Sequence, residues 1–135
     1  MVNPRSVYGP IGLTLMVSAL ASESFAGPES AAELAKAKLE AAREAYKASV
    51  QALQTGKADA EKVYVWSRRW LEAQADQSGT RTDRAAFEAH LQRMKELRKL
   101  ATTRYHTGLV PVAEVIGTDF YVAEAGLCLE RAKAK

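Results

Sequence analysis

The sequence is poor in residues that often carry chemistry: among its 135 residues it has one cysteine, Cys128, and two histidines. A single cysteine excludes an internal disulfide and a Cys-x-x-Cys-His haem attachment. Flanked by leucines, Cys128 is typical of a small buried hydrophobe, although a lone cysteine in an exported protein can also link two chains. Neither His90 nor His106 follows a glutamate by three positions, so the ligand pattern of a di-iron helical bundle is missing.

Other functional motifs are missing too. There is no Gly-x-Ser-x-Gly, no His-Glu-x-x-His and no glycine-rich phosphate loop, motifs that mark hydrolases, zinc proteases and nucleotide-binding proteins. The formal charge is only +3. Basic and acidic residues are mixed along residues 36–47, as on solvated helix faces and unlike the one-sided basic surface that binds nucleic acid. We therefore expect a protein that is not an enzyme, has no cofactor or metal and binds no nucleic acid.

The first 26 residues differ from the rest of the sequence. One arginine precedes an apolar run over residues 11–20, and small residues follow up to Ala26. This order is typical of a secretory signal peptide, with cleavage after Ala26 or, as a second choice, after Ala21. The run is shorter than the roughly 18 residues that a membrane-spanning helix needs. We expect a mature periplasmic or secreted domain, 27–135, without a membrane span; a first helix that stays attached is the alternative.

The mature sequence contains an internal repeat. Residues 107–115 have the same layout as residues 55–63, and the offset of 52 positions holds without a gap on both sides of this stretch. Such a repeat fixes the architecture, because each copy is one structural unit. The halves span about 31–78 and 83–134. The identical pairs include Leu39 and Leu91, Glu44 and Glu96, Gly56 and Gly108, Val63 and Val115, Glu72 and Glu124, and Ala73 and Ala125.

Each half predicts two helices joined by a short turn. Ser30 and Glu33 form a capping box at the start of the first helix. Gly56 and Gly108 are suited to the left-handed position that ends a helix, and Pro111 is suited to the first turn of the last one. The last helix has apolar positions at Val112, Val115, Ile116, Phe120, Ala123 and Leu127.

No segment alternates with the period of a strand. We therefore predict an all-α protein. Its fold should be an antiparallel four-helix bundle or coiled coil that is built from two tandem helical hairpins, because helices joined by short connections pack as antiparallel neighbours.

Trp66 and Trp70 lie one helical turn apart, on a seam that also includes Val63, Ala73 and Gln77. We interpret the tryptophans as core anchors, since two indoles on one face bury a large apolar area. Arg68 and Arg69 would then lie at the rim and stack on an indole. The alternative is a small-ligand or metal-binding site. A cavity beside the tryptophans would favour the alternative, whereas a filled core and an exposed apolar tip would favour an interaction protein.

Residues 105–115, followed by residues 123–125, resemble the turn of the bacterial outer-membrane efflux proteins, the TolC-like family. In that family a Tyr or Phe, then Gly-Leu-Val, an acidic residue and Val or Leu mark a turn between long periplasmic helices. The resemblance covers only this helical-hairpin portion. It implies hairpins whose tips meet a periplasmic adaptor, and it assigns the partner contact to Gly108, Leu109 and Val110.

These patterns favour an exported, non-catalytic helical protein that acts by helix–helix interaction. Its expected partner is a protein of the cell envelope or a second copy of itself. A helical bundle that binds a small ligand or a metal is the alternative function.

Overall fold

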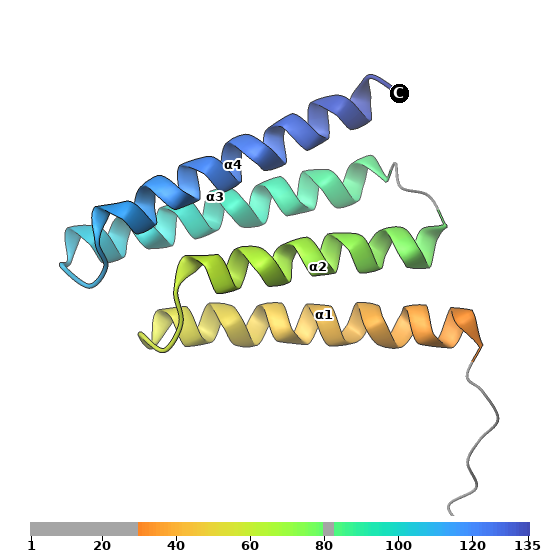
Figure 1. Cartoon of the computed structure of the whole chain (residues 1–135), viewed down its shortest axis with the longest axis horizontal. Coiled ribbons are helices and arrows are strands. Elements are labelled where there is room, and N and C mark those ends of the chain that lie inside the picture. The colour runs from red at the N-terminus through yellow and green to blue at the C-terminus, as the bar shows by residue number, and fades with distance from the viewer. Residues whose placement is uncertain (1–29, 80–82) are drawn as a thin grey trace, which may run out of the picture.

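The computed structural model describes residues 30–79 and 83–135, and within them it contains four helices and no strand. The helices are α1 (Ala31–Gln54), α2 (Ala60–Ser78), α3 (Arg84–His106) and α4 (Val112–Lys133). In Figure 1, α1 and α2 form one hairpin and α3 and α4 form a second. This arrangement confirms the predicted all-α four-helix bundle built from two tandem hairpins. The predicted signal peptide lies outside the described residues.

Side-chain caps explain where three of the four helices begin. The Ser30 hydroxyl accepts from the Glu33 amide at 3.2 Å, and the Glu33 carboxylate accepts from the Ser30 amide at 2.8 Å, which is the predicted capping box. Asp59 and Asp83 each accept from an amide of the first turn of α2 and α3 at 3.0 Å. No side chain caps α4, whose N-cap residue is Pro111. The first amides of α4 therefore have no such acceptor.

The two hairpin turns have the same geometry. Gly56 and Gly108 adopt positive φ angles of 73° and 74°, which L side chains rarely adopt. In each turn the glycine amide and the next amide donate back to two carbonyls of the last helical turn, the Schellman arrangement. The bonds run from Gly56 to Leu53 (3.1 Å), Lys57 to Ala52 (2.8 Å), Gly108 to Tyr105 (3.0 Å) and Leu109 to Arg104 (2.8 Å). Each bond recurs 52 residues later, as the internal repeat predicts.

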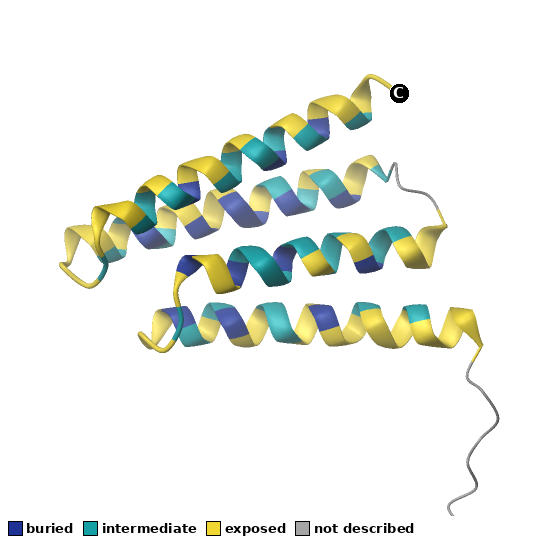
Figure 2. Ribbon diagram, viewed as in Figure 1, coloured by how far each residue is buried: buried dark blue, intermediate teal, exposed yellow. Residues whose placement is uncertain are grey.

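The hairpins pack through α2 and α3, with α2 also touching α4. No Cα atom of α1 lies within 8 Å of a Cα atom of α3 or α4. Buried residues occur on all four helices, as the dark bands in Figure 2 show. The core cluster comprises Leu53, Ala60, Val63, Met94, Leu97 and Ala125. Because α1 and α4 are the outermost helices, each keeps one face free of the other hairpin.

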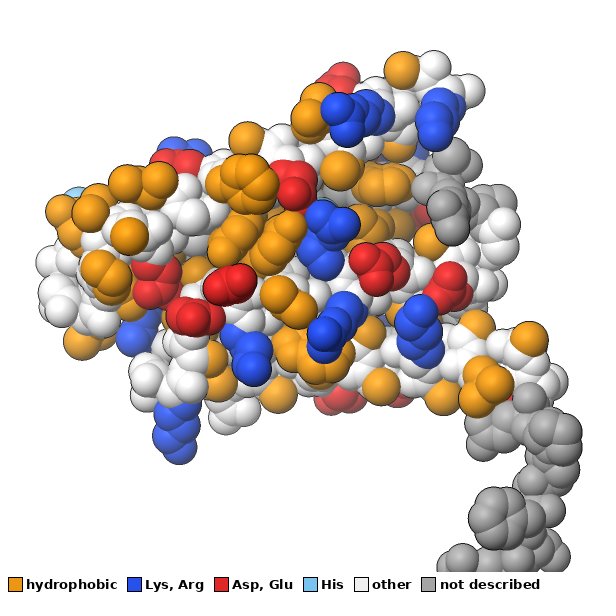
Figure 3. All heavy atoms as spheres, in the orientation of Figure 1, with side chains coloured by type: hydrophobic (Ala, Val, Ile, Leu, Met, Phe, Trp, Pro, Cys, Tyr) orange, Lys and Arg blue, Asp and Glu red, His pale blue; other side chains and the backbone are white. Residues whose placement is uncertain are grey.

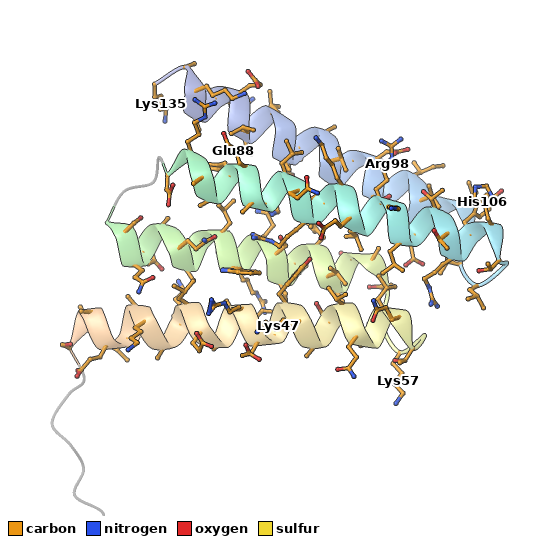
Figure 4. All side chains as sticks on the ribbon, turned by 180° about the vertical axis from the view of Figure 1, so that it is seen from behind. Lys47, Lys57, Glu88, Arg98, His106 and Lys135 are labelled. Carbon is orange, nitrogen blue, oxygen red and sulfur yellow. The ribbon has the colours of Figure 1, made fainter. Side chains whose placement is uncertain are left out.

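The second hairpin caps the first at the turn end of the molecule. The Glu114 carboxylate, in the first turn of α4, accepts from the Ala60 amide at 2.9 Å. Arg104, near the end of α3, donates through Nη1 to the Gln54 carbonyl at 3.1 Å. A negative side chain thus meets the N-terminus of α2 and a positive one the C-terminus of α1, as the helix dipoles favour. These bonds hold the two turns near each other, and Figure 4 shows Lys57 and His106 at that same end.

Replacing Gly108 by alanine should lower the free energy of unfolding by about 1–2 kcal/mol, because a β-carbon is strained at its positive φ. Gly126→Ala is the matched control. Gly126 lies inside α4, and an added β-carbon would meet no atom within 4 Å. That change should stabilise the protein by up to about 1 kcal/mol, since alanine forms helix better than glycine. Urea unfolding of both variants measures the difference; a stabilising Gly108→Ala would mean that no turn forms there.

Candidate functional site

The tip of the second hairpin brings the predicted contact residues to the surface. Gly108 and Leu109 are exposed and Val110 is partly buried. Leu109 follows the left-handed glycine, a position whose apolar side chain usually packs on the last turn of the helix. Here that turn offers the polar residues Arg104 and Thr103, and Leu109 remains 63% exposed. The tip therefore presents a large apolar side chain to solvent.

An apolar stripe continues from the tip along the outside of α4. We call Val112, Ile116, Phe120, Ala123 and Leu127 the outer stripe; all five are exposed, and the four large ones are 51–61% exposed. Figure 3 shows hydrophobic side chains gathered over α4 and between α4 and α2. The buried residues of α4 are Thr118, Ala125 and Leu129, on the opposite face. Contiguous exposed apolar surface of this kind marks interaction sites.

Sequence patterns alone did not separate the outer stripe from the core, because α4 is apolar on both sides. Val115, Tyr121 and Val122 are partly buried on the face that packs inward. Hydrophobic periodicity then has no single direction, and it gives no basis for choosing the packed face. The sequence does contain one signal of the stripe, namely that α4 has two apolar faces. A helix at the edge of a bundle buries only one face against its neighbours, so the second face is left exposed.

A buried polar cluster joins the hairpins on the inside. Ser67 of α2 and His90 and Arg93 of α3 are each at most 7% exposed. Arg93 Nε donates to the Ser67 hydroxyl at 2.7 Å, and that hydroxyl lies 2.8 Å from His90 Nδ1. Because arginine can only donate, the Ser67 hydroxyl accepts from Arg93, and its own proton is then free to be donated to His90 Nδ1. We call Ser67, His90 and Arg93 the polar joint.

Burial, and secondly the positive charge of Arg93, lowers the pKa of His90 to about 4. His90 is therefore neutral at pH 7, as the bond from the Ser67 hydroxyl requires. Burial also lowers the pKa of Arg93. The guanidinium of Arg93 lies 4.2 Å from the centre of the Trp70 ring and 5.6 Å from that of Tyr46, which places electron-rich rings beside the buried cation.

Neither tryptophan is among the fully buried residues that the structure describes. Trp70 is partly buried and packs at 5.4 Å from the Tyr46 ring. Trp66 is also partly buried, with the Arg69 guanidinium 4.5 Å from its ring centre. The fully buried position between them is Ser67. Trp70 thus lies against the polar joint. The predicted seam did not anticipate this joint because it skipped the serine.

The ligand-binding alternative needs the two arginines free, and both are engaged. Arg68 forms an ion pair of 2.6 Å with Glu124, which also accepts from the Tyr64 hydroxyl at 2.7 Å. Arg69 already covers one face of Trp66. The grooves beside Trp66, of about 320 and 350 Å³, are open to solvent. A larger hollow of about 510 Å³ has Arg68, His90 and Cys128 in its wall but neither tryptophan.

Protein-family models, curated proteins and solved structures give no match to this chain. In the part of the chain that the structure describes, no helix is both long and apolar enough to cross a membrane. The same residues contain no cluster of three or more histidine, cysteine, aspartate or glutamate side chains able to hold a metal. Function must therefore be inferred from the tip, the outer stripe and the polar joint.

The polar joint predicts a defined loss of stability in acid. Between pH 6.5 and pH 4, His90 is protonated in the unfolded chain but not in the folded chain. The free energy of unfolding therefore decreases as the pH is lowered, by about 3 kcal/mol over the whole interval. Above about pH 7 this contribution is constant. His90→Gln should remove the loss over that interval, and His106→Gln, at an exposed position, should keep it. Urea unfolding from pH 7.5 to 4.5 measures the slopes; equal slopes in both variants would contradict the prediction.

Proposed function

We propose that this chain is an exported, non-catalytic helical protein that binds a protein of the cell envelope by helix–helix contact through its second hairpin tip. The tip consists of Gly108, Leu109 and Val110. The observation that carries the proposal is the exposure of Leu109, 63%, at a turn whose backbone is fixed by its own hydrogen bonds. A rigid turn loses little entropy on binding, so burial of its apolar side chain favours association.

The resemblance to the efflux family supports the same residues. In that family the Gly-Leu-Val turn is the hairpin tip, and the tips meet a periplasmic adaptor. The Gly108 turn of this chain has the left-handed glycine and paired amide bonds that make such a tip compact. Both turns lie at one end of the molecule, so a partner hairpin could approach along the helix axes. We propose that the chain uses its hairpins as those proteins do, without a channel of its own.

The energetics of the tip fit a contact of modest strength. Full burial of one leucine side chain contributes about 1.5–3 kcal/mol relative to exposure. Pro111 leaves the N-terminus of α4 without a side-chain cap, so the first amides of that helix can donate to acceptors on a partner. An apolar residue beside a helix N-terminus without a side-chain cap suits a protein surface with both apolar and polar groups.

The test replaces Leu109 and Val110 together by serine and compares this variant with Leu34→Ser. Leu34 is also an exposed leucine, 54%, but it lies in the first turns of α1, away from the hairpin turns. Both variants should unfold within a few degrees of the parent, because surface substitutions change stability by about 0.5 kcal/mol or less. The parent and Leu34→Ser should capture the same proteins from envelope extracts. The double variant should fail to capture them.

Quantitative mass spectrometry of the captured proteins gives the readout. A partner that binds the parent and the double variant equally would refute the tip as the contact. A large drop in unfolding temperature, with no partner lost, would show instead that Leu109 and Val110 serve the fold.

A further inference from the structure

The outer stripe of α4 packs against no other helix of the described chain. Its members lie on the side of α4 opposite the buried Thr118, Ala125 and Leu129. A helix that is apolar on both sides is normally covered on both sides. Nothing in the other described helices covers this face, because α4 packs only against α3 and α2. The stripe is therefore an apolar face that the described chain leaves uncovered.

We propose that the outer stripe binds the outer stripe of a second copy, so that two α4 helices pack antiparallel in a two-fold symmetric dimer. Closed two-fold dimers are the commonest homo-oligomers, and their interface uses the same patch on both subunits. A single straight helix with one continuous stripe is suited to that arrangement. This inference goes beyond the proposed function, which concerns the tip.

The residue sizes along the stripe are self-complementary in the antiparallel register. When Val112 lies opposite Leu127 of the second copy, Ile116 comes opposite Ala123, and the two Phe120 rings meet near the two-fold axis. The spacing of the stripe is 4, 4, 3 and 4 residues, which keeps its members on one side of the helix. On either side of the central aromatic pair the large Ile116 then faces the small Ala123, and Val112 faces Leu127 at the two ends. Such alternation is what lets two helices interdigitate.

The exposed area matches what a weak dimer needs. Four large side chains, each more than half exposed, offer on the order of 100 Å² apiece. Ala123 and the flanking aliphatic stems add to this, so a pair of stripes buries about 1,000 Å² in total, the lower limit for a specific interface. Because an interface at this lower limit leaves little surplus over the cost of association, we expect a weak dimer with a dissociation constant on the order of micromolar.

Two acidic groups beside the stripe, Asp119 and Glu130, do not oppose the contact. Asp119 is paired with Arg98 of α3 at 2.7 Å. Glu130 is paired with Lys133 at 2.8 Å. Since both acidic groups already have partners in their own copy, two stripes can meet without leaving a buried carboxylate unpaired.

Sedimentation equilibrium of the mature chain, from about 1 to 200 µM, tests the proposal, since a micromolar dimer dissociates within that range. The average mass should rise from monomer to dimer with concentration. Phe120→Ser should remain a monomer throughout, and Leu34→Ser should behave as the parent. Circular dichroism checks that both variants are helical. A parent that stays monomeric at every concentration would overturn the proposal.

Crosslinking gives a second test that does not depend on losing the dimer. In a Cys128→Ser background, a short bis-maleimide should join Phe120→Cys to itself but should not join Leu34→Cys. A mixture of Val112→Cys and Leu127→Cys should crosslink as a mixed pair, with far less product from either alone. If the mixed pair did not crosslink and Val112→Cys instead crosslinked strongly to itself, the two α4 helices would be parallel. That result would overturn the antiparallel register.

The outcomes separate this proposal from the tip proposal. The double serine variant at Leu109 and Val110 should still dimerise, and Phe120→Ser should still capture the tip partner. If the chain is monomeric and Phe120→Ser loses a captured protein, the stripe binds a different protein, and the second-copy proposal is wrong.

Discussion

The structure depends on one buried contact, in which the Ser67 hydroxyl of α2 meets Arg93 and His90 of α3. Arg93 is a buried cation without an ion-pair partner among the described residues. Removing a charge from water is costly unless other groups compensate. Here the hydroxyl and the rings of Trp70 and Tyr46 surround it. Because Tyr46 belongs to α1, one side chain of α3 reaches both helices of the first hairpin.

This contact joins α1 to α3 through side chains, although the backbone of α1 stays more than 8 Å from α3 and α4 at every Cα pair. A buried polar group needs a hydrogen-bond partner, so it allows fewer alternative packings of the two hairpins than an apolar surface does. The caps from Arg104 and Glu114 fix the turn end in the same way. These bonds occupy the inside of the bundle. Of the large apolar side chains that stay exposed, all but Leu34 and Tyr105 lie at the tip or on the outer stripe. Both proposals, a partner at the tip and a second copy on the stripe, follow from that division.

Local chemistry made the helices and turns predictable. The Ser30 and Asp59 caps and the left-handed glycines act within a few residues of their own position, so the sequence contains all their partners. The turn that carries Leu109 was predictable for the same reason, whereas its role as a contact tip rests on the resemblance to the efflux family. The polar joint was not, because Ser67 and His90 are 23 positions apart and meet only after the hairpins pack. Likewise, the faces of α4 became distinguishable only once α2 and α3 had covered one of them.

A double-mutant cycle on Ser67→Ala and Arg93→Met tests most directly whether the polar joint couples the hairpins. Each free energy of unfolding is measured in urea at pH 7.5, where His90 is neutral. If the two residues act as one buried contact, their coupling energy should be about 1–3 kcal/mol. Additive effects, with a coupling within about 0.3 kcal/mol of zero, would show that the residues contribute independently and that the hairpins are held together by apolar packing alone.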